Sequence, residues 1–138
     1  MKIALFEPEI PQNTGNIARL CACTGAGLYL IGKLGFVLSD KYLKRAGLDY
    51  WEDVNIKHLS SLDELIEENP NSNIYFFSTK AKKFYTEQKF SVDDILVFGS
   101  ETRGLPVDII NKYQDSCLKI PMKEGQRSLN LSYSAAIV

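Results

Sequence analysis

Short apolar runs recur along this chain and alternate with segments of helical periodicity, and this pattern restricts its fold more than any other feature. Five runs are wholly or almost wholly apolar: Ile3–Phe6, Leu28–Ile31, Ile74–Phe77, Ile95–Phe98 and Cys117–Ile120. Strands that are apolar on both faces occur in parallel sheets covered by helices on both sides. The length of 138 residues is that of one domain. We therefore expect a single α/β domain over residues 1–138 with a largely parallel sheet.

Helix signals fill the intervals between these runs. We expect five helices, namely over residues 16–24 before Gly25, 41–45 after Asp40, 62–69 from a capping box at Ser61, 107–110 after Pro106, and 129–138. Asn13 and Thr14 are the residues that we expect to cap the first helix. One further strand is predicted near residues 54–59, with His58 close to its end.

The charge balance and the apolar pattern exclude several functions. Lys and Arg number 16, Asp and Glu 17, and the formal net charge is −1, so bulk charge does not favour nucleic-acid binding. No apolar run approaches the roughly 18 residues of a membrane span. The N-terminus reaches Glu7 and Pro8 too soon for a signal peptide. We expect a cytoplasmic protein that acts through a pocket or through local basic patches.

The scarce residue types are interpreted as structural. The three cysteines lack the paired spacing of zinc ligands and are expected to be small buried residues of a reduced protein: Cys21, Cys23 and Cys117. A Ser-His-Asp triad would need His58, but the chain has no G-x-S-x-G elbow. Gly27, Gly32 and Lys33 have the spacing of a P-loop, yet Leu34 replaces the Ser or Thr that would bind magnesium. The residues between these glycines are predicted to form a strand, so we reject a P-loop.

Three segments that follow predicted strands carry the most unusual polar sequence. They span residues 8–19, 98–106 and 120–132. The second has glycines near both ends and places Glu101 and Arg103 beside a strand end. The third places Ser128 and Asn130 near a helix N-terminus, which favours polar or anionic groups. Because ligands of open α/β sheets bind beyond the carboxyl ends of the strands, we expect the three segments to form one site.

In order and spacing these segments resemble the three signature motifs of the SPOUT methyltransferase superfamily. The matching stretches are NTGNIAR at 13–19, FGSETRGLP at 98–106, IPM at 120–122 and RSLNLS at 127–132. The likeness is closest to the minimal branch that methylates the ribose 2′-hydroxyl of cytidine or uridine 34 in tRNA, which FEPEIP at 6–11 and RAGLDY at 45–50 also resemble. It implies a deep trefoil knot in the C-terminal part and a final helix that continues beyond Val138, so we expect this helix to be truncated.

The resemblance also implies a cofactor, a partner and roles for particular residues. The cofactor would be S-adenosylmethionine, without a metal, and the enzyme a homodimer that acts on the tRNA anticodon loop rather than on DNA or a membrane. The cofactor-binding residues carried over are Phe77, Gly99, Ile120 and Ser128. Arg19 would be nearest the transfer chemistry, supported by Asn13, Glu101 and Asn130. Because a guanidinium keeps its proton and so makes a poor base, we favour Arg19 as an electrostatic anchor rather than a general base.

RNA contacts must come from local basic clusters, and the sequence alone does not choose among them. The clusters are Lys41, Lys44 and Arg45; Lys80, Lys82 and Lys83; and Lys119, Lys123 and Arg127. Three other functions stay open. They are SPOUT methylation of a base or of another RNA site, a non-catalytic RNA-binding protein of the same fold, and a nucleotide-binding α/β domain without an RNA partner.

Overall fold

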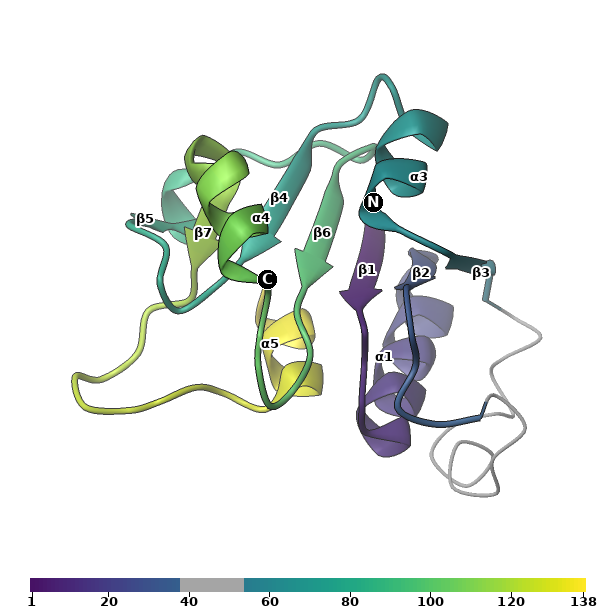
Figure 1. The fold of residues 1–138 in the computed structure, drawn as a ribbon, viewed down its shortest axis with the longest axis horizontal. Coiled ribbons are helices and arrows are strands. Elements are labelled where there is room, and N and C mark those ends of the chain that lie inside the picture. The colour runs from purple at the N-terminus through teal and green to yellow at the C-terminus, as the bar shows by residue number, and fades with distance from the viewer. Residues whose placement is uncertain (38–53) are drawn as a thin grey trace.

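Strands and helices alternate along the computed structural model, which describes residues 1–37 and 54–138 (Figure 1). The elements in chain order are β1 (Lys2–Phe6), α1 (Pro11–Thr24), β2 (Gly27–Ile31), β3 (Ile56–Leu59), α3 (Leu62–Glu68), β4 (Ile74–Phe77), β5 (Lys83–Phe84), β6 (Ile95–Phe98), α4 (Val107–Lys112), β7 (Cys117–Lys119) and α5 (Leu131–Ile137). Short 3-10 turns follow β5 at Tyr85–Glu87 and precede β7 at Gln114–Ser116. The helix predicted over residues 41–45 and the motif at 45–50 lie outside the described residues.

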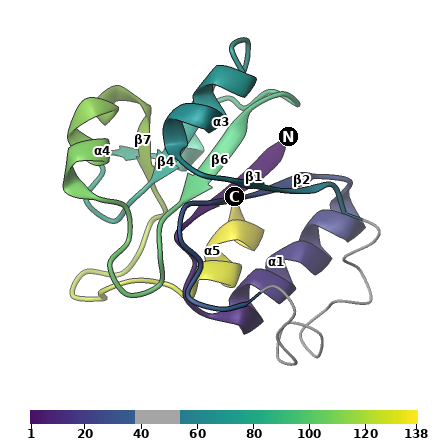
Figure 2. The ribbon, with the colours of Figure 1, turned by 45° about the vertical axis from the view of Figure 1, so that its right-hand side comes forward.

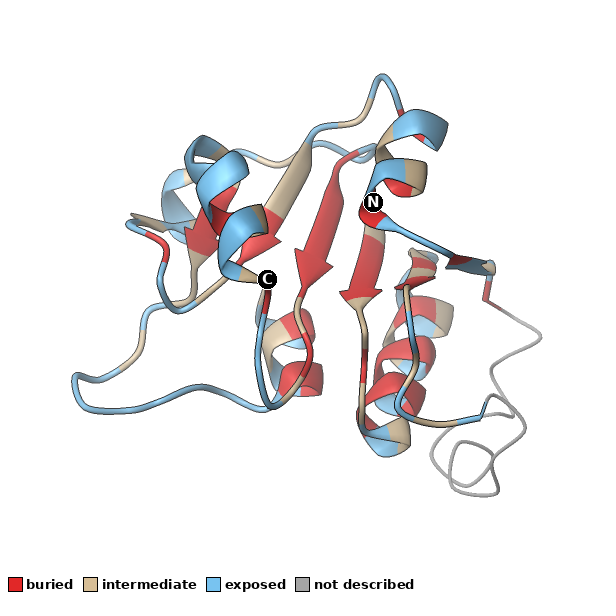
Figure 3. Ribbon diagram, in the orientation of Figure 1, coloured by how far each residue is buried: buried red, intermediate tan, exposed pale blue. Residues whose placement is uncertain are grey.

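The strands of the described residues form one sheet in the order β3-β2-β1-β6-β4-β7-β5. Every neighbouring pair is parallel, which confirms the predicted sheet type. From β1 the chain builds outward through β2 and β3, and the later strands lie on the other side of β1. The central strand β6 is buried at all four of its positions, as expected for a strand covered on both faces (Figure 3).

Helices cover both faces of the sheet (Figures 1 and 2). Alternate residues of β1 point to opposite faces, so Ile3 and Leu5 join one apolar core and Ala4 the other. The first core is completed by buried residues of α1 and α5: Ile17, Ala18, Cys21, Leu131 and Ala135. The second is completed from α3 and from the segment that contains α4: Leu62, Leu65, Leu105 and Ile110. Since α1 and α5 pack on the same face of the sheet, the first motif, on α1, lies near the end of the third motif, at the start of α5.

The first helix starts at Pro11 rather than at residue 16, so the predicted start is wrong. Proline suits the first helical position, where its missing N–H is not needed. Asn13 and Thr14 lie inside the helix and do not cap it, and the N-cap residue Ile10 makes no side-chain capping bond. Among the described residues the buried Thr14 hydroxyl has no hydrogen-bond partner. The predicted end is confirmed, because Gly25 follows the helix in the left-handed conformation at φ +72°.

Other predictions have mixed outcomes. Cys21 and Cys117 are buried as expected, but Cys23 is exposed on α1, so its predicted burial is wrong. The side chain of Ser61 accepts a bond from the Glu64 N–H, which confirms the capping box of α3. The residues between Gly27 and Gly32 form β2, which confirms the rejection of a P-loop. The edge strand β5 was not predicted, and the trefoil knot stays a prediction. None of the described helices has the length and apolar character of a membrane span.

Candidate functional site

A cavity of about 520 Å³ lies at the carboxyl ends of the central strands. Its walls come from the start of α1 and from the segments that follow β4, β6 and β7. A cavity of this size accommodates a small-molecule ligand or cofactor. The prediction that the three motif segments form one site is therefore confirmed at the level of geometry.

One wall is a tight turn over residues 99–104, which we call the clasped loop. The Gly104 N–H donates to the Ser100 carbonyl at 2.9 Å, so the turn closes on itself. A Cβ atom on Gly99 would lie 2.2 Å from backbone atoms of both Gly104 and Leu105. Glycine is thus required at position 99 because the backbone passes too close for any side chain.

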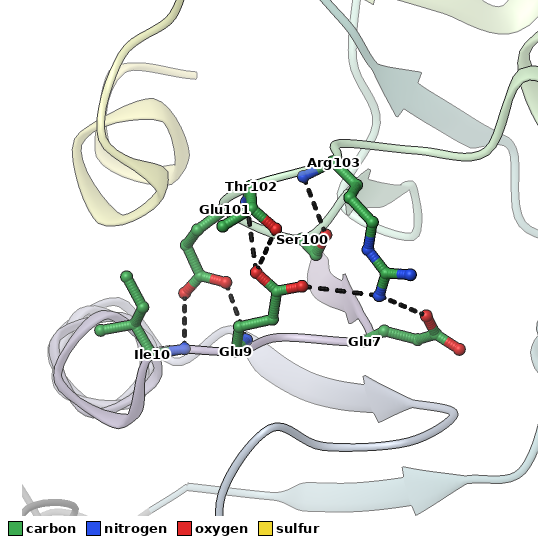
Figure 4. A network of polar contacts seen from close by, with 7 residues as sticks. All are labelled: Glu7, Glu9, Ile10, Ser100, Glu101, Thr102 and Arg103. Carbon is green, nitrogen blue, oxygen red and sulfur yellow. Dashed lines mark hydrogen bonds and ion pairs between the residues drawn. The ribbon is translucent and has the colours of Figure 1, made fainter.

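Glu9 and Glu101 fasten the clasped loop to the segment before α1 (Figure 4). The Glu101 carboxylate accepts the backbone N–H groups of Glu9 at 2.8 Å and of Ile10 at 3.2 Å. In return, the Glu9 carboxylate accepts the hydroxyl of Thr102 at 2.5 Å and its N–H at 3.3 Å. Each carboxylate therefore binds the backbone of the other loop. Glu101 thus accepts the N–H of Ile10, the N-cap residue of α1, which makes no side-chain capping bond of its own.

Arg103 extends this contact at the surface. Its Nη2 atom lies 3.3 Å from a carboxylate oxygen of Glu7 and 3.5 Å from one of Glu9. The Arg103 side chain is 70% exposed, so these ion pairs add little to stability on their own. The pKa of Glu9 is lowered, mainly by the hydrogen bond from the Thr102 hydroxyl and further by the charge of Arg103. The contact is therefore strongest while Glu9 is ionised.

A chain of side-chain hydrogen bonds connects the three motifs. The Asn13 amide donates to Glu101 at 3.0 Å, and the Asn130 amide donates to the Asn13 carbonyl oxygen at 3.0 Å. The carbonyl oxygen of Asn130 then accepts the N–H and hydroxyl of Ser132 and caps α5. Asn13 is 5% exposed, so both ends of its amide are held inside the protein. We call Glu101, Asn13 and Asn130 the relay.

Another wall comes from the segment over residues 121–130, which we call the open loop. All of its residues except Met122 are exposed (Figure 3). Within the described part of the chain, its one backbone hydrogen bond between non-helical residues joins the Gln126 N–H to the Lys123 carbonyl at 3.2 Å. Its C-terminal end is fixed by Asn130 of the relay. The two walls of the cavity thus differ greatly in how firmly they are held.

Seven of the eight predicted site residues line the cavity: Phe77, Gly99, Ile120, Ser128, Asn13, Glu101 and Asn130. Arg19 does not line it within the described chain; it is exposed on α1, six residues beyond Asn13 and so about 9 Å further along the helix axis. No group of three or more His, Cys, Asp or Glu side chains suited to a metal ion occurs in residues 1–37 and 54–138.

Glu9 was missed as a site residue. A usable signal exists, because Glu9 and Glu101 are each the third residue after the end of a strand, and those strands, β1 and β6, are parallel neighbours. Equal offsets after adjacent parallel strands bring two side chains to the same edge of the sheet. His58 lies on β3, where its Nε2 is 2.8 Å from the Gly32 carbonyl oxygen, outside the residues that line the cavity.

Comparisons with known proteins agree with this arrangement. The chain matches the SpoU rRNA Methylase family over residues 1–138. A curated relative from Saccharophagus degradans, named tRNA (cytidine(34)-2'-O)-methyltransferase, is 48% identical over 137 residues, which are 99% of this chain and 89% of the relative. A solved structure concerned with the 2-OH methylation of C/U34 on tRNA has 42% identity and a TM-score of 0.93, over 99% of this chain and 89% of that one.

A more distant structure extends the likeness of the fold. The SpoU methyltransferase AviRb from Streptomyces viridochromogenes, in complex with the cofactor AdoMet, has 21% identity and a TM-score of 0.86. The match covers 99% of this chain and 56% of that one. At this level of identity the comparison supports the shared fold alone.

Proposed function

The chain belongs to the SpoU rRNA Methylase family, and from this premise we propose that it methylates the ribose 2′-hydroxyl of cytidine or uridine 34 in tRNA, with S-adenosylmethionine as methyl donor. The observation that carries the proposal is the relay, which joins all three motifs at one cavity. The relatives named for this reaction at 42–48% identity support the choice of substrate. Such a substrate would place the enzyme in the cytoplasm.

The cavity fits the proposed cofactor. Phe77, Leu105 and Ile120 present apolar surface at the strand ends, as an adenine ring requires, and Ser128 adds a hydroxyl. Gly99 permits the tight turn of the clasped loop that forms one wall of the cavity. When bound, S-adenosylmethionine would supply an electrophilic methyl group on its sulfonium, for transfer to the 2′-oxygen with release of the hydroxyl proton to solvent and of the thioether product. We assign the cofactor to Phe77, Gly99, Ile120 and Ser128.

The relay positions the site rather than carrying a proton. Both oxygens of Glu101 accept backbone N–H groups, and the amides of Asn13 and Asn130 are engaged at both ends. Groups held in this way orient the cavity walls and require no change during the reaction. We therefore propose positioning roles for Asn13, Glu101 and Asn130. The electrostatic role, at the nucleophilic oxygen or an adjacent phosphate, is assigned to Arg19.

The position of Arg19 favours a homodimer. Since Arg19 lies along α1 away from the cavity of its own chain, we propose that it serves the cavity of a second copy. The nearby helix α5 carries exposed apolar side chains, with Tyr133 67% and Ile137 47% exposed, which suits a subunit interface. In such a dimer each site would combine one chain's relay with its partner's arginine.

Transfer of radiolabelled methyl from S-adenosylmethionine to unmodified and native tRNA, followed by nuclease mapping, tests the reaction. We expect label in a 2′-O-methylated nucleotide at position 34. The Arg19→Ala variant is expected to lose methyl transfer and to keep cofactor affinity. Label at another position would keep the chemistry and change the substrate. No label in either tRNA pool, with cofactor bound, would favour the non-catalytic RNA-binding alternative.

Mixed dimers test the shared site. Arg19→Ala is combined with Ile120→Trp, a variant in which the larger side chain fills the cofactor cavity. Each variant alone is expected to be inactive, whereas the mixture regains about a quarter of wild-type activity, because half of the dimers are mixed and have one complete site of two. A mixture as inactive as its parts, with both variants folded and exchanging subunits, contradicts the proposal that Arg19 acts across the interface.

A further inference from the structure

The residues that line the cavity carry a local excess of positive charge, although the whole chain has a formal charge of −1. Three cations, Lys80, Arg103 and Arg127, stand against one anion, Glu101. Arg103 is paired with Glu7 and Glu9. In the described residues neither Lys80 nor Arg127 takes part in an ion pair. These two residues therefore hold the uncompensated charge of the site.

Lys80 and Arg127 come from different walls of the cavity. Lys80 follows β4, where its N–H donates to the Ser78 hydroxyl at 3.2 Å and the neighbouring Ala81 is buried. Arg127 lies in the open loop. This loop follows β7, and it leaves the sheet on the side where the segment from β4 to β5 also runs (Figure 1). Both residues are exposed and both line the cavity. They are therefore accessible to a ligand that is larger than the cavity itself.

The charge does not suit the proposed cofactor. S-adenosylmethionine carries a sulfonium and an ammonium against a single carboxylate, so its net charge is positive and an uncompensated pair of cations repels it overall. A polyanion is the ligand class that such a pair attracts, and RNA phosphates are bound in proteins mainly by lysine and arginine. We infer that Lys80 and Arg127 bind backbone phosphates of the RNA next to the target ribose. This inference rests on the proposed function and names the RNA-binding residues of that same site.

The other cations of the basic clusters predicted from the sequence do not line the cavity or lie outside the described residues. Lys82 and Lys123 are exposed but do not line the cavity. The side chain of Lys83 donates to Gln88, and that of Lys119 lies over the ring of Phe84. Lys41, Lys44 and Arg45 lie outside the described residues. From each of the two described clusters, one cation borders the cavity, and these are the two that we assign to phosphate.

Charge-removing variants test the inference through RNA affinity rather than turnover alone. Lys80→Gln and Arg127→Gln are compared with Lys89→Gln, a matched control whose lysine is exposed and lies outside the cavity, in the segment that leads to β6. Unmodified tRNA is the probe, and binding is measured from about 50 to 200 mM salt. Each test variant is expected to bind tRNA about fivefold more weakly and to lower the log–log salt slope by about 1.

Measuring cofactor binding distinguishes an RNA phosphate from the cofactor carboxylate as the anion that these cations bind. The carboxylate of S-adenosylmethionine is the other group that Lys80 or Arg127 could meet, so the dissociation constant of the cofactor is measured for every variant. We expect this constant to stay within about twofold of wild type, with KM for tRNA raised and kcat at saturating tRNA nearly unchanged. Lys80→Arg is expected to restore tRNA affinity, since it keeps the charge.

Two results would overturn the inference. One is tRNA affinity and salt slope equal to wild type in both test variants, and the other is a loss of cofactor affinity as large as the loss of tRNA affinity. Failure of the proposed function is recognised separately, because wild-type enzyme would then transfer no methyl group to tRNA. If wild type methylates tRNA and the variants bind tRNA normally, the inference alone is wrong.

Discussion

The two walls of the cavity differ in how many contacts hold them in the free protein. The clasped loop is fixed by its own backbone bond, by the Glu9 and Glu101 carboxylates and by a glycine with no room for a side chain. The open loop is almost wholly exposed and, in the described chain, makes one backbone hydrogen bond of its own. A site with one fixed and one weakly held wall can hold a small cofactor against the first and adjust the second to a larger ligand.

Because the two loops are held so differently, substitutions in them should change different properties of the protein. Substitutions in the clasped loop break bonds that exist before any ligand arrives, so they lower the stability of the free protein. Substitutions in the open loop before Asn130 remove few contacts of the free protein, so they should lower stability less and act mainly on ligand binding.

The largest expected effect comes from a methyl group at position 99. In Gly99→Ala the new Cβ would lie 2.2 Å from backbone atoms of Gly104 and Leu105, so the turn must open. We expect a loss of about 3 kcal/mol or more in the free energy of unfolding, measured by urea denaturation. The matched variant is Gly125→Ala in the open loop, where nothing lies within 4 Å of the new atom and φ is +84°. It should lose only about 1 kcal/mol from the positive φ.

Replacing one carboxylate in each loop tests the same difference in stability through the hydrogen bonds that are lost. Glu101 accepts the N–H groups of Glu9 and Ile10 and the amide of Asn13, whereas Glu124 is exposed in the open loop. Glu101→Gln keeps the shape but sets an NH2 group against N–H donors, which should cost about 2 kcal/mol of stability and weaken cofactor binding. Glu124→Gln should change stability by less than about 0.5 kcal/mol. Equal losses in the two variants would mean that Glu101 does not hold the wall.

The features that could be predicted from the sequence are those that depend on the local pattern of apolar and polar residues. Runs such as Ile95–Phe98 are apolar on both faces whatever surrounds them, so the parallel sheet and the position of the cavity could be anticipated. The start of α1 was missed although Pro11 is a local signal for it. The bond that holds its N-cap residue could not be anticipated, because the acceptor is Glu101, 91 residues from Ile10. The edge strand β5 has two residues and no periodicity to detect.

The placement of Arg19 shows a second limit of sequence patterns. The motif that contains Arg19 and Asn13 is continuous, but α1 separates the two residues by about 9 Å along its axis. A continuous motif therefore does not establish that its residues line one cavity of one chain. Cys23 illustrates the same point for burial, since it is two residues from the buried Cys21 and faces solvent.

A smaller effect is the pH dependence of the free energy of unfolding, which reports the contribution of the ionised Glu9 carboxylate. Its folded-state pKa is lowered below the ordinary value of 4.5, chiefly by the Thr102 hydroxyl. The ionised carboxylate therefore contributes stability above about pH 4.5, and this contribution is lost as the pH falls through the lowered pKa. Glu9→Gln should be less stable than wild type near pH 6, and the difference should shrink toward about pH 3. The measurement is urea denaturation at each pH.

Glu124→Gln is the control for this profile, because it removes a carboxylate from the open loop without removing a contact of the clasped loop. Its stability near pH 6 should lie within about 0.5 kcal/mol of wild type. A Glu9→Gln curve that runs parallel to wild type over the whole range would show that Glu9 does not contribute through its charge, and the reciprocal contact with Glu101 would then depend on the Glu101 bonds alone.

The smallest expected effect is a slower proteolytic cleavage of the open loop when the cofactor is bound. Lys123 and Arg127 are exposed trypsin sites in this loop, whereas Arg103 is held by Glu7 and Glu9 in the clasped loop. Limited proteolysis should therefore cut first after Lys123 or Arg127. Because Ile120 and Ser128 are proposed cofactor residues, bound S-adenosylmethionine should slow these cuts by about threefold. Cleavage after Lys89, outside the cavity, should keep its rate, and equal slowing at all three sites would indicate global stabilisation instead of ordering of the open loop.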